Sequence, residues 1–257
     1  MADEVLCAIA DGVATVTLNR PAKRNALDRA VLAGLDACFE GFERDRALRV
    51  VVLRGAGPAF CAGMDLDELA ARQDEEVDPE AGVVATLRRI ERCRHPTLAV
   101  VHGDAFAGGL ELALHCDLRL AADGARFAMP LARLGLVVPF ALGQKLVEVV
   151  GPAMARQILL VGRPLSARRA YEIGMVHEVV PAADLERASD DLARAVGEAA
   201  PLSLAGMKQT ILRGLAGREG IEHADLDALA AQARRSRDAR EGIRAMLEKR
   251  RAVFRGE

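Results

Sequence analysis

The chain has 257 residues, of which 51% are hydrophobic and 28% charged, with one Tyr and no Trp. This composition is typical of a globular protein whose core is built from Ala, Val and Leu. The 35 Lys and Arg residues nearly balance the 37 Asp and Glu residues, and no aromatic residues alternate with the basic ones. We therefore expect no nucleic-acid partner.

The five cysteines are odd in number, widely spaced and without a CxxC pair. This pattern predicts neither a disulfide framework nor a metal site, and it suits a reducing cytoplasm. The first residues, MADEVLCAIADG, are acidic where a signal peptide would be basic. No later segment has the roughly 18 uncharged apolar residues of a membrane span. We expect a soluble cytoplasmic protein with no membrane partner.

The first half of the chain predicts repeated strands and helices. Strands at Val5–Ile9 and Val13–Leu18 flank the turn pair Asp11-Gly12 and form a hairpin. From Asp28 to Phe42 apolar residues recur every three or four positions, which predicts a helix. Further strands are predicted at Arg49–Arg54, Thr97–Val101 and Asp117–Ala121, and further helices at Glu80–Cys93 and Gly108–His115. The alternation favours an α/β class with buried strands.

Two segments depart from this pattern. Asp65–Pro79 is polar and acidic, and we interpret it as a mobile flap, with a solvated loop of no role as the alternative. After Pro181 only helices are predicted, at Ala182–Ala199, Leu202–Leu215 and Ile221–Leu247, the last broken near Ser236-Arg237-Asp238. The apolar stripe of that last stretch is too large for an isolated surface helix. It must pack on this chain's core or on a neighbouring subunit.

The most informative segment is His102-Gly-Asp-Ala-Phe-Ala-Gly-Gly-Leu-Glu-Leu-Ala-Leu-His115. Its glycine pair begins a helix at Gly108, whose first N–H groups have no intrahelical acceptor and can hold a developing oxyanion. Glu111 lies about one turn further on the same face. It is the only charged residue between Ala105 and Leu114. Because a buried charge is costly, its presence suggests a use in chemistry, with a structural ion pair as the alternative.

A second segment, Pro58-Ala-Phe-Cys-Ala-Gly-Met-Asp-Leu66, places a glycine just before a polar stretch. Gly63 allows a close approach of the backbone to a ligand and exposes the N–H of Met64. Two backbone donors from separate loops are what a thioester oxyanion needs. The segment is weak evidence alone but complements the glycine pair of the first segment.

These residues resemble the crotonase, or enoyl-CoA hydratase/isomerase, superfamily. The resemblance covers essentially the whole chain through these motifs: Asn19-Arg-Pro-Ala-Lys-Arg-Asn-Ala-Leu27, Phe60-Cys-Ala-Gly-Met-Asp-Leu66, Pro96-Thr-Leu-Ala-Val-Val-His-Gly103, Ala107-Gly-Gly-Leu-Glu-Leu-Ala-Leu-His-Cys-Asp117, Gly174-Met-Val-His-Glu178 and the tail from Gly242 to Arg251. It implies a spiral core of repeated ββα units over residues 1–195 that carries the acyl-CoA site. It also implies a C-terminal helical region over residues 196–257 that builds a homotrimer or a dimer of trimers.

The resemblance also implies roles for individual positions. It puts the oxyanion hole at the N–H groups of Met64 and Gly108, and one catalytic glutamate at Glu111. The adenine and phosphates of CoA would lie near Lys23, Arg24, Ala26, Ala62, Gly63, Asp65 and Leu66. Lys249 and Phe254 would approach the CoA of a neighbouring subunit. CoA enters as part of the substrate, and no permanently bound cofactor and no metal are expected.

Three positions depart from the family pattern. Hydratases of the family place a second glutamate directly after the proline that matches Pro130, and this chain has Leu131 there. Phe140-Ala-Leu-Gly143 replaces the usual glycine run after the proline that matches Pro139, so we expect this segment to narrow the acyl pocket. Ala107 replaces the first residue of a common triple glycine, which we expect to be a mild change because the donor belongs to Gly108.

The missing second acid leaves several reactions open. Hydration needs one group to activate water and one to protonate the α-carbon. One carboxylate suffices to move a double bond or to assist the loss of a carboxylate, although family isomerases with one acid often keep it elsewhere. A hydratase with a substitute acid is an alternative, and the candidates are Asp65, Asp67, Glu68 and Asp104, each of which also fits a structural role.

Two other kinds of protein could carry these residues, a Cys–His enzyme and a non-catalytic binding protein. A Cys–His nucleophile drawn from His102, His115, Cys61 and Cys116 is disfavoured, because CoA already activates the acyl group. A crotonase-fold protein that binds acyl-CoA with little or no turnover would also accept Leu131. The expected function is an acyl-CoA-processing enzyme that stabilises a thioester enolate, by hydration or dehydration, isomerisation or decarboxylation.

Overall fold

A computed structural model describes residues 4–71, 79–215, 217 and 220–257. The strands are β1 (Val5–Ala10), β2 (Val13–Leu18), β3 (Val50–Gly55), β4 (Ala59–Cys61), β5 (Thr97–Val101), β6 (Asp104–Phe106), β7 (Leu118–Ala122), β8 (Arg126–Ala128), β9 (Leu165–Ser166) and β10 (Glu178–Val180). The α-helices are α1 (Arg29–Phe42), α2 (Leu66–Ala71), α3 (Pro79–Arg92), α4 (Gly108–Leu114), α5 (Phe140–Arg156), α6 (Ala167–Glu172), α7 (Leu185–Gly197), α8 (Pro201–Leu215), α9 (Ala224–Arg235) and α10 (Arg237–Leu247). Shorter helical turns are η1 (Pro21–Lys23), η2 (Leu131–Leu134), η3 (Gln157–Val161) and η4 (Ala182–Asp184).

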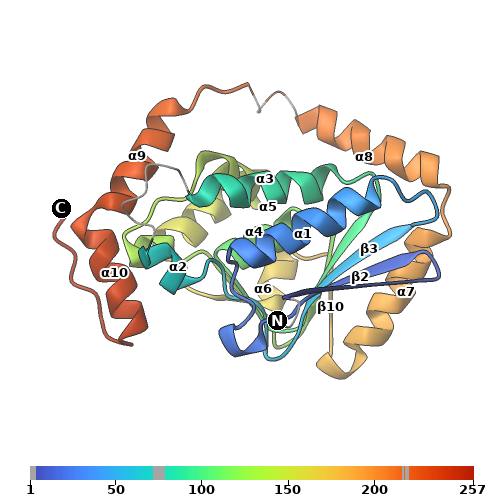
Figure 1. The fold of residues 1–257 in the computed structure, drawn as a ribbon, viewed down its shortest axis with the longest axis horizontal. Coiled ribbons are helices and arrows are strands. Elements are labelled where there is room, and N and C mark those ends of the chain that lie inside the picture. Colours follow the sequence, from blue (N-terminus) through green and yellow to red (C-terminus); the bar gives the residue numbers. More distant parts are fainter. Residues whose placement is uncertain (1–3, 72–78, 216, 218–219) are drawn as a thin grey trace.

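The chain alternates between two sheets as it advances. The larger sheet has the order β1-β2-β3-β5-β7-β10, parallel from β2 onward after an antiparallel hairpin. The smaller sheet has the order β4-β6-β8-β9, with β8 and β9 antiparallel. From β3 to β8, each pair of consecutive strands contributes one strand to each sheet before a helix or helical turn follows (Figure 1). This arrangement confirms the predicted α/β spiral of ββα units.

The larger sheet separates two hydrophobic cores because successive strand residues point to opposite faces. On β3, Val51 and Leu53 belong to the main core, whereas Val50 and Val52 belong to a second core against α7. The main core includes buried residues of α1, α3 and α4, which lie on the same side of the sheet in Figure 1. The site described below lies on this helix-covered side.

Helix α1 shows how closely the sequence pattern matches the structure. The Asp28 side chain caps its start by accepting a hydrogen bond from the Val31 N–H at 2.9 Å. Its buried residues are Val31, Leu35, Phe39 and Phe42, which are spaced three or four apart. The other strands and helices predicted in the first half are also present, with bounds within one residue of the prediction.

The smaller sheet and helix α5 were not predicted. Strands β4, β6, β8 and β9 have three residues or fewer, which is too short to show an alternating pattern. Helix α5 contains Gly151 and Pro152, which are signals for a break, and its backbone does leave the helical conformation at Gly151 (φ 72°, ψ 166°).

The predicted flap is wrong in the part that the structure describes. Residues 66–71 form α2, and its Leu69 is buried. The Asp65 carboxylate accepts hydrogen bonds from the N–H groups of Asp67 (3.0 Å) and Glu68 (3.4 Å), so a capped helix forms in this acidic stretch. Residues 72–78 of the predicted flap lie outside the described residues.

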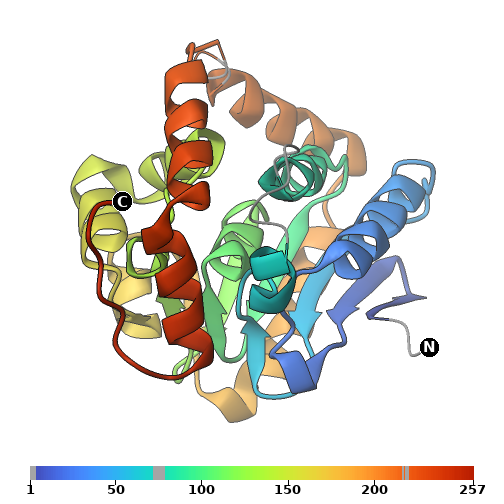
Figure 2. The same ribbon diagram turned by 60° about the vertical axis from the view of Figure 1, so that its left-hand side comes forward.

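The C-terminal region is helical, as predicted, and the last stretch is broken at Ser236. The Ser236 side chain caps α10 by accepting from the Ala239 N–H at 2.9 Å. Helix α10 packs through Ala239 and Ile243 on a small core that includes Leu69 and Leu134, and Figure 2 shows α9 and α10 end to end beside α2. In the parts of the chain with described coordinates, no helix has the length and apolarity needed to cross a membrane.

Candidate active site

Helix α4 carries the predicted catalytic carboxylate into the interior. Its residues from Gly109 to Leu114 are all buried. The Glu111 N–H donates to the Ala107 carbonyl at 3.1 Å, which is the first hydrogen bond of the helical ladder. The N–H of Gly108 therefore precedes the ladder and is available to a ligand.

The segment that contains Gly63 and Met64 lies beside the start of α4. The Leu27 N–H donates to the Gly63 carbonyl (2.7 Å) and the Asp65 N–H donates to the Leu27 carbonyl (2.9 Å), which is the pattern of a parallel bridge between Leu27 and Met64. In this pattern the N–H of Met64 points away from Leu27. A methyl group placed on Gly108 would lie 3.7 Å from the Met64 nitrogen. The structure thus brings these two backbone nitrogens to one place.

Close backbone contacts fix this arrangement. A methyl group on Gly109 would lie 2.1 Å from the Cys61 carbonyl oxygen, so α4 can approach β4 only because residue 109 has no side chain. Gly63 has a φ of 96°, which L side chains rarely adopt, and a methyl group there would lie 3.2 Å from the Gly108 nitrogen. Both glycines are therefore required by the geometry of the site.

Asn25 anchors the loop before Gly63, and sequence reasoning missed this role. Its side chain is fully buried and its amide donates to the carbonyls of Ala56 (2.8 Å), Ala59 (2.8 Å) and Phe60 (3.2 Å). The Arg20 N–H in turn donates to the Asn25 side-chain oxygen at 2.9 Å. Asn25 lies in a family motif, but its acceptors are carbonyls more than thirty residues away, which no local pattern reveals.

A cavity of about 540 Å³ opens in front of Glu111, a size suited to a small-molecule ligand. Most of the predicted site residues line it, namely Lys23, Arg24, Ala26, Ala62, Met64, Asp65, Leu66, Gly108, Glu111 and Leu131. Leu142, from the segment predicted to narrow the pocket, also lines it. Much of the remaining lining is apolar and was not predicted, including Leu134, Leu136, Val138, Met246 and Leu247. The last two come from α10, so the C-terminal region completes the wall of the cavity.

Glu111 is held in an unusual electrostatic environment. Its side chain is fully buried, and neither carboxylate oxygen has a hydrogen-bond partner among the described residues. The Nδ1 atom of His115 lies 3.8 Å from the nearer oxygen. Burial raises the pKa of Glu111 well above its usual value, and the positive charge of Lys145 only partly opposes this. A carboxyl group with a raised pKa is suited to give and take a proton near neutral pH.

The two expected departures in the acyl pocket have different outcomes. Leu131 is half-buried at the start of η2 and lines the cavity, where it offers no proton. Phe140 is not among the residues that line the cavity. As the first residue of α5, it stacks its ring on His223, with ring centroids 4.6 Å apart and an interplanar angle of 18°. The cavity is bounded at this point by Pro139 and Leu142 instead.

Alanine at position 107 is not the mild change that we expected. It is the N-cap residue of α4 and has φ 47° and ψ −119°, a conformation that glycine adopts far more readily. A side chain in such a region costs on the order of 1–3 kcal/mol. The donor does belong to Gly108, but the backbone that positions this donor is strained at the preceding residue.

The two basic residues that line the cavity, Lys23 and Arg24, form ion pairs with acidic residues. Lys23 pairs with Asp67 at 2.6 Å, and Arg24 pairs with the buried Asp104 at 2.6 Å. Asp104 also binds Arg126 at 2.7 Å.

The four candidate substitute acids thus all have cationic partners, since Glu68 pairs with Arg29 at 3.2 Å and Asp65 with Arg20 at 3.1 Å. Burial would raise the pKa of Asp65, but hydrogen bonds from the Glu68 N–H and from Arg20 hold it below its usual value. These contacts favour the structural interpretation of the acids.

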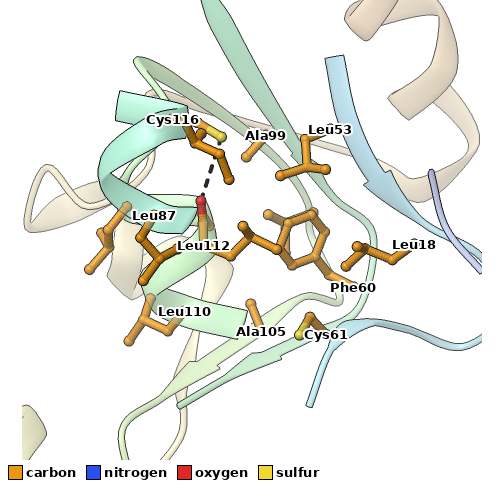
Figure 3. Close-up of a cluster of buried hydrophobic side chains, with 14 of the residues drawn as sticks. Leu18, Leu53, Phe60, Cys61, Leu87, Ala99, Ala105, Leu110, Leu112 and Cys116 are labelled. Carbon is orange, nitrogen blue, oxygen red and sulfur yellow. Dashed lines mark hydrogen bonds between the residues drawn. The ribbon is translucent and has the colours of Figure 1, made fainter. Parts of the chain in front are cut away.

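The two cysteines considered as nucleophiles, Cys61 and Cys116, lie in surroundings that keep their thiols unreactive. Burial raises the pKa of Cys61 to about 12 and that of Cys116 to about 12. Figure 3 shows both within the main hydrophobic cluster, with the Cys116 thiol donating to the Leu112 carbonyl at 3.5 Å. A thiolate is the reactive form, so these residues are poor nucleophiles.

Lys249 and Phe254 do not line the cavity of their own chain. Lys249 follows α10 with a φ of 55°, and Phe254 is exposed in the C-terminal tail. Their predicted role toward a neighbouring subunit therefore stays a prediction.

Comparisons with known proteins identify the family and agree with the fold. Residues 8–257 match the family model described as enoyl-CoA hydratase/isomerase. The short-chain-enoyl-CoA hydratase of Clostridium acetobutylicum is 33% identical over 93% of this chain and 92% of its own. An enoyl-CoA hydratase/isomerase from Xanthobacter autotrophicus Py2 has a TM-score of 0.87 at 33% identity, covering 98% of this chain and 99% of its own. Methylmalonyl-CoA decarboxylase in complex with 2-nitronate-propionyl-CoA has a TM-score of 0.90 at 25% identity, covering 99% of each chain.

The spiral of ββα units with two backbone donors beside a buried carboxylate defines a crotonase-fold protein. The chain belongs to the enoyl-CoA hydratase/isomerase family.

Proposed function

We propose that this protein transforms acyl-CoA thioesters through a thioester enolate. The N–H groups of Met64 and Gly108 would bind the enolate oxygen, while Glu111 would move a proton at the carbon next to the thioester carbonyl. The observation that carries this proposal is the position of Glu111, which is fully buried and without hydrogen-bond partners among the described residues. It lines the same cavity as the two donors.

The chemistry follows from the properties of the thioester. When the α C–H bond breaks, its electron pair moves into the carbonyl and places negative charge on the oxygen, and the proton goes to a carboxylate oxygen of Glu111. Backbone donors aimed at that oxygen stabilise the charge more strongly than they stabilise the neutral carbonyl. The reverse step returns a proton from Glu111 to carbon, so one carboxylate serves both directions.

Leu131 favours reactions that need one proton-transfer group. Double-bond isomerisation and decarboxylation meet this condition, whereas efficient hydration uses a second acid. The similarity to methylmalonyl-CoA decarboxylase is compatible with this preference. CoA would be bound as part of the substrate, with its phosphates near Lys23 and Arg24, and without a permanently bound cofactor or a metal.

A second candidate is an acyl-CoA-binding protein with little or no turnover. It is favoured by the same residue, because Leu131 removes a proton-transfer group from the wall of the cavity. The two candidates differ in one respect: the binding protein would not depend on the ionisable group of Glu111.

We also propose that the chain forms a homotrimer or a dimer of trimers through residues 196–257. Several large apolar side chains of this region are exposed in the single chain, namely Leu202, Met207, Ile211, Ile221, Leu226, Leu229, Met246 and Leu247. Their burial in an interface would be favourable. Lys249 and Phe254 would then lie near the CoA of a neighbouring subunit. Light scattering that finds only a species near the chain mass of 27.4 kDa would contradict this assembly.

Turnover on a panel of thioesters tests the proposed function. The panel contains short and long enoyl-, 3-hydroxyacyl- and malonyl-type CoA thioesters, and we expect turnover of at least one class that is lost in Glu111→Gln. Calorimetry with acetyl-CoA and CoA should show competitive binding. Binding without turnover would favour the second candidate, and an absence of both would refute the assignment of the cavity.

We also propose a cytoplasmic location, because all five cysteines are free. Cell fractionation can check this proposal.

A further inference from the structure

Two cysteines lie where the first strand packs on the first helix. Cys7 is on β1, the edge strand of the larger sheet, and its side chain is exposed. Cys38 is on α1 and is half-buried beside the main core. Both are free thiols, and neither takes part in the site described above. Their relation depends on how the strand and the helix meet.

The pairing of the hairpin puts Cys7 on the face of the sheet that α1 covers. Residues directly opposite each other on antiparallel strands share one face of the sheet. Cys7 is paired with Val16, and Val5 is paired with Leu18. Both partners on β2 belong to the main core, to which α1 also contributes its buried residues. Val5 and Cys7 therefore both point toward α1.

The helix and the strand run in the same direction and approach closely. Helix α1 connects β2 to the parallel strand β3, so it runs back antiparallel to β2 and parallel to β1. A methyl carbon placed on Gly34 of α1 would lie only 3.0 Å from the Cβ of Val5. Disulfide-bonded cysteines have Cβ atoms about 3.5–4.5 Å apart. The two backbones are therefore near enough at this contact for such a bond.

One step along both elements leads from this contact to the two cysteines. Two residues advance a strand by about 6.6 Å, and four residues advance a helix by about 6 Å. These steps lead from Val5 to Cys7 on β1 and from Gly34 to Cys38 on α1. Cys38 also has a side-chain hydrogen bond with Cys7. The two thiols are thus in contact in the reduced protein.

The two thiols differ in how readily they react. Burial raises the pKa of Cys38 to about 11, and the charge of Cys7 and its hydrogen bond add to this effect. Cys7 is exposed and can meet small molecules in solvent. The other three cysteines, Cys61, Cys93 and Cys116, are buried and have raised pKa values. A reaction with a solvent-borne oxidant therefore begins at Cys7.

We propose that Cys7 and Cys38 form a reversible disulfide when the protein meets a small-molecule disulfide such as oxidised glutathione. The Cys7 thiolate attacks one sulfur of the oxidant, whose S–S bond breaks and releases one glutathione thiolate. Cys38 then loses its proton to solvent, and its sulfur attacks the Cys7 sulfur and releases the second glutathione. The two cysteines lose two electrons, and the oxidant gains them. This inference does not depend on the proposed function.

The disulfide would tie the edge strand β1 to α1. It closes a loop of about 30 residues, and a cross-link of this length stabilises a protein by restricting its unfolded chain. For a chain of this size we expect the melting temperature to rise by about 5–10 °C. Because neither cysteine lines the acyl cavity, the affinity for CoA should be the same in the oxidised and reduced proteins.

The test treats the reduced, folded protein with oxidised glutathione and then blocks the remaining thiols with N-ethylmaleimide. Mass spectrometry of the intact protein should show the loss of two hydrogen atoms and no bound glutathione. After digestion, one cross-linked pair of peptides should contain Cys7 and Cys38. Dithiothreitol should restore both thiols and return the melting temperature to that of the reduced protein.

Substitution of single cysteines separates an internal disulfide from ordinary modification of an exposed thiol. Cys38→Ser and Cys38→Ala leave Cys7 without a second thiol. Both variants should retain one glutathione on Cys7 and show no disulfide-dependent rise in melting temperature. Cys93→Ser removes a buried cysteine from another part of the core and is the matched control. It should cross-link as the wild-type protein does.

Several outcomes would overturn the proposal. A wild-type protein that keeps glutathione on Cys7, as the Cys38 variants do, would show that the second thiol is out of reach. A disulfide that forms only between two chains, or no reaction at all, would contradict it equally. An oxidised protein that melts below the reduced protein would show that the bond does not fit the contact between β1 and α1.

Discussion

The two walls of the acyl cavity differ in kind. The α4 wall carries the Gly108 N–H and the Glu111 carboxyl, and its position is fixed by the contact between Gly109 and the Cys61 carbonyl. The wall formed by η2 and the residues after it is apolar, with Leu131 at the family's second acid position. Under the proposed function, the first wall would supply the enolate chemistry and the second wall would determine which reaction follows. A family assignment alone therefore does not define the reaction.

Substitution of Glu111 is the most direct test of the difference between the two walls. Glu111→Gln preserves the shape of the side chain and removes proton transfer, so turnover should fall by about 10²–10⁴-fold with little change in CoA affinity. Steady-state kinetics and calorimetry measure the two quantities. Unchanged turnover combined with altered stability would show that Glu111 is a structural remnant.

A second variant tests whether the α4 wall is fixed by backbone contact. In Gly109→Ala the new methyl group would lie 2.1 Å from the Cys61 carbonyl oxygen, so the helix or β4 must shift. We expect the free energy of unfolding to fall by about 1–3 kcal/mol, together with a loss of activity. Gly82→Ala on α3, where a methyl group meets no atom within 4 Å, is the matched control and should not destabilise. Equal denaturant midpoints for the two variants would refute the contact.

Adding a second acid at position 131 tests whether the apolar wall limits the reaction. Leu131→Glu should raise hydration of crotonyl-CoA at least about tenfold above the wild-type baseline, because it adds a second carboxyl group to the lining of the cavity that Glu111 also lines. The apolar lining will raise the pKa of the new group and limit the gain. Leu131→Gln is the control, because its side chain has a similar size and no carboxyl group to transfer a proton. Wild-type hydration on the order of 10² s⁻¹ or faster would contradict the claim that Leu131 removes this activity.

The burial of Glu111 also predicts a dependence of stability on pH. Its pKa is raised in the folded protein, so the folded state keeps a proton that the unfolded state loses above the usual glutamate value of 4.5. The free energy of unfolding therefore falls as pH rises from that value to the raised pKa, by up to about 1.4 kcal/mol per pH unit. Glu111→Gln lacks this dependence and should gain stability relative to wild type as pH rises above the usual glutamate value of 4.5. Parallel stability curves for the two proteins would show that Glu111 has an ordinary pKa.

The smallest expected effect concerns Ala107. Ala107→Gly relieves the strained conformation before Gly108 and should raise the free energy of unfolding by about 1 kcal/mol, after the entropy of the new glycine is subtracted. Ala113→Gly, in the regular part of the same helix, should lower it by about 1 kcal/mol. Chemical denaturation of both variants checks the opposite signs. A loss of stability in Ala107→Gly would mean that residue 107 is unstrained.

The sequence predicted most of the long elements, apart from α5, and most cavity residues, but not the contacts that hold the site together. Helix α1 was predictable because its spacing of apolar residues extends over the whole element, and strand β5 because it is a short, almost entirely apolar run directly after Pro96. The three-residue strands β4 and β6, which present the Cys61 segment and α4, have no such pattern. Phe140 was expected in the pocket from its neighbours in sequence, yet stacking on His223 places its ring elsewhere, and that partner is 83 residues away.

Met246 and Leu247 have a consequence for how ligand affinity is regulated. Both line the acyl cavity, and both remain about half exposed, at 43% and 47%. Under the proposed function, a contact that covers the outer side of α10 would act on the same two side chains that a bound thioester would touch. By thermodynamic reciprocity, if association changes the affinity for the thioester, the thioester changes association by the same factor. Apparent substrate affinity in this protein should then depend on protein concentration.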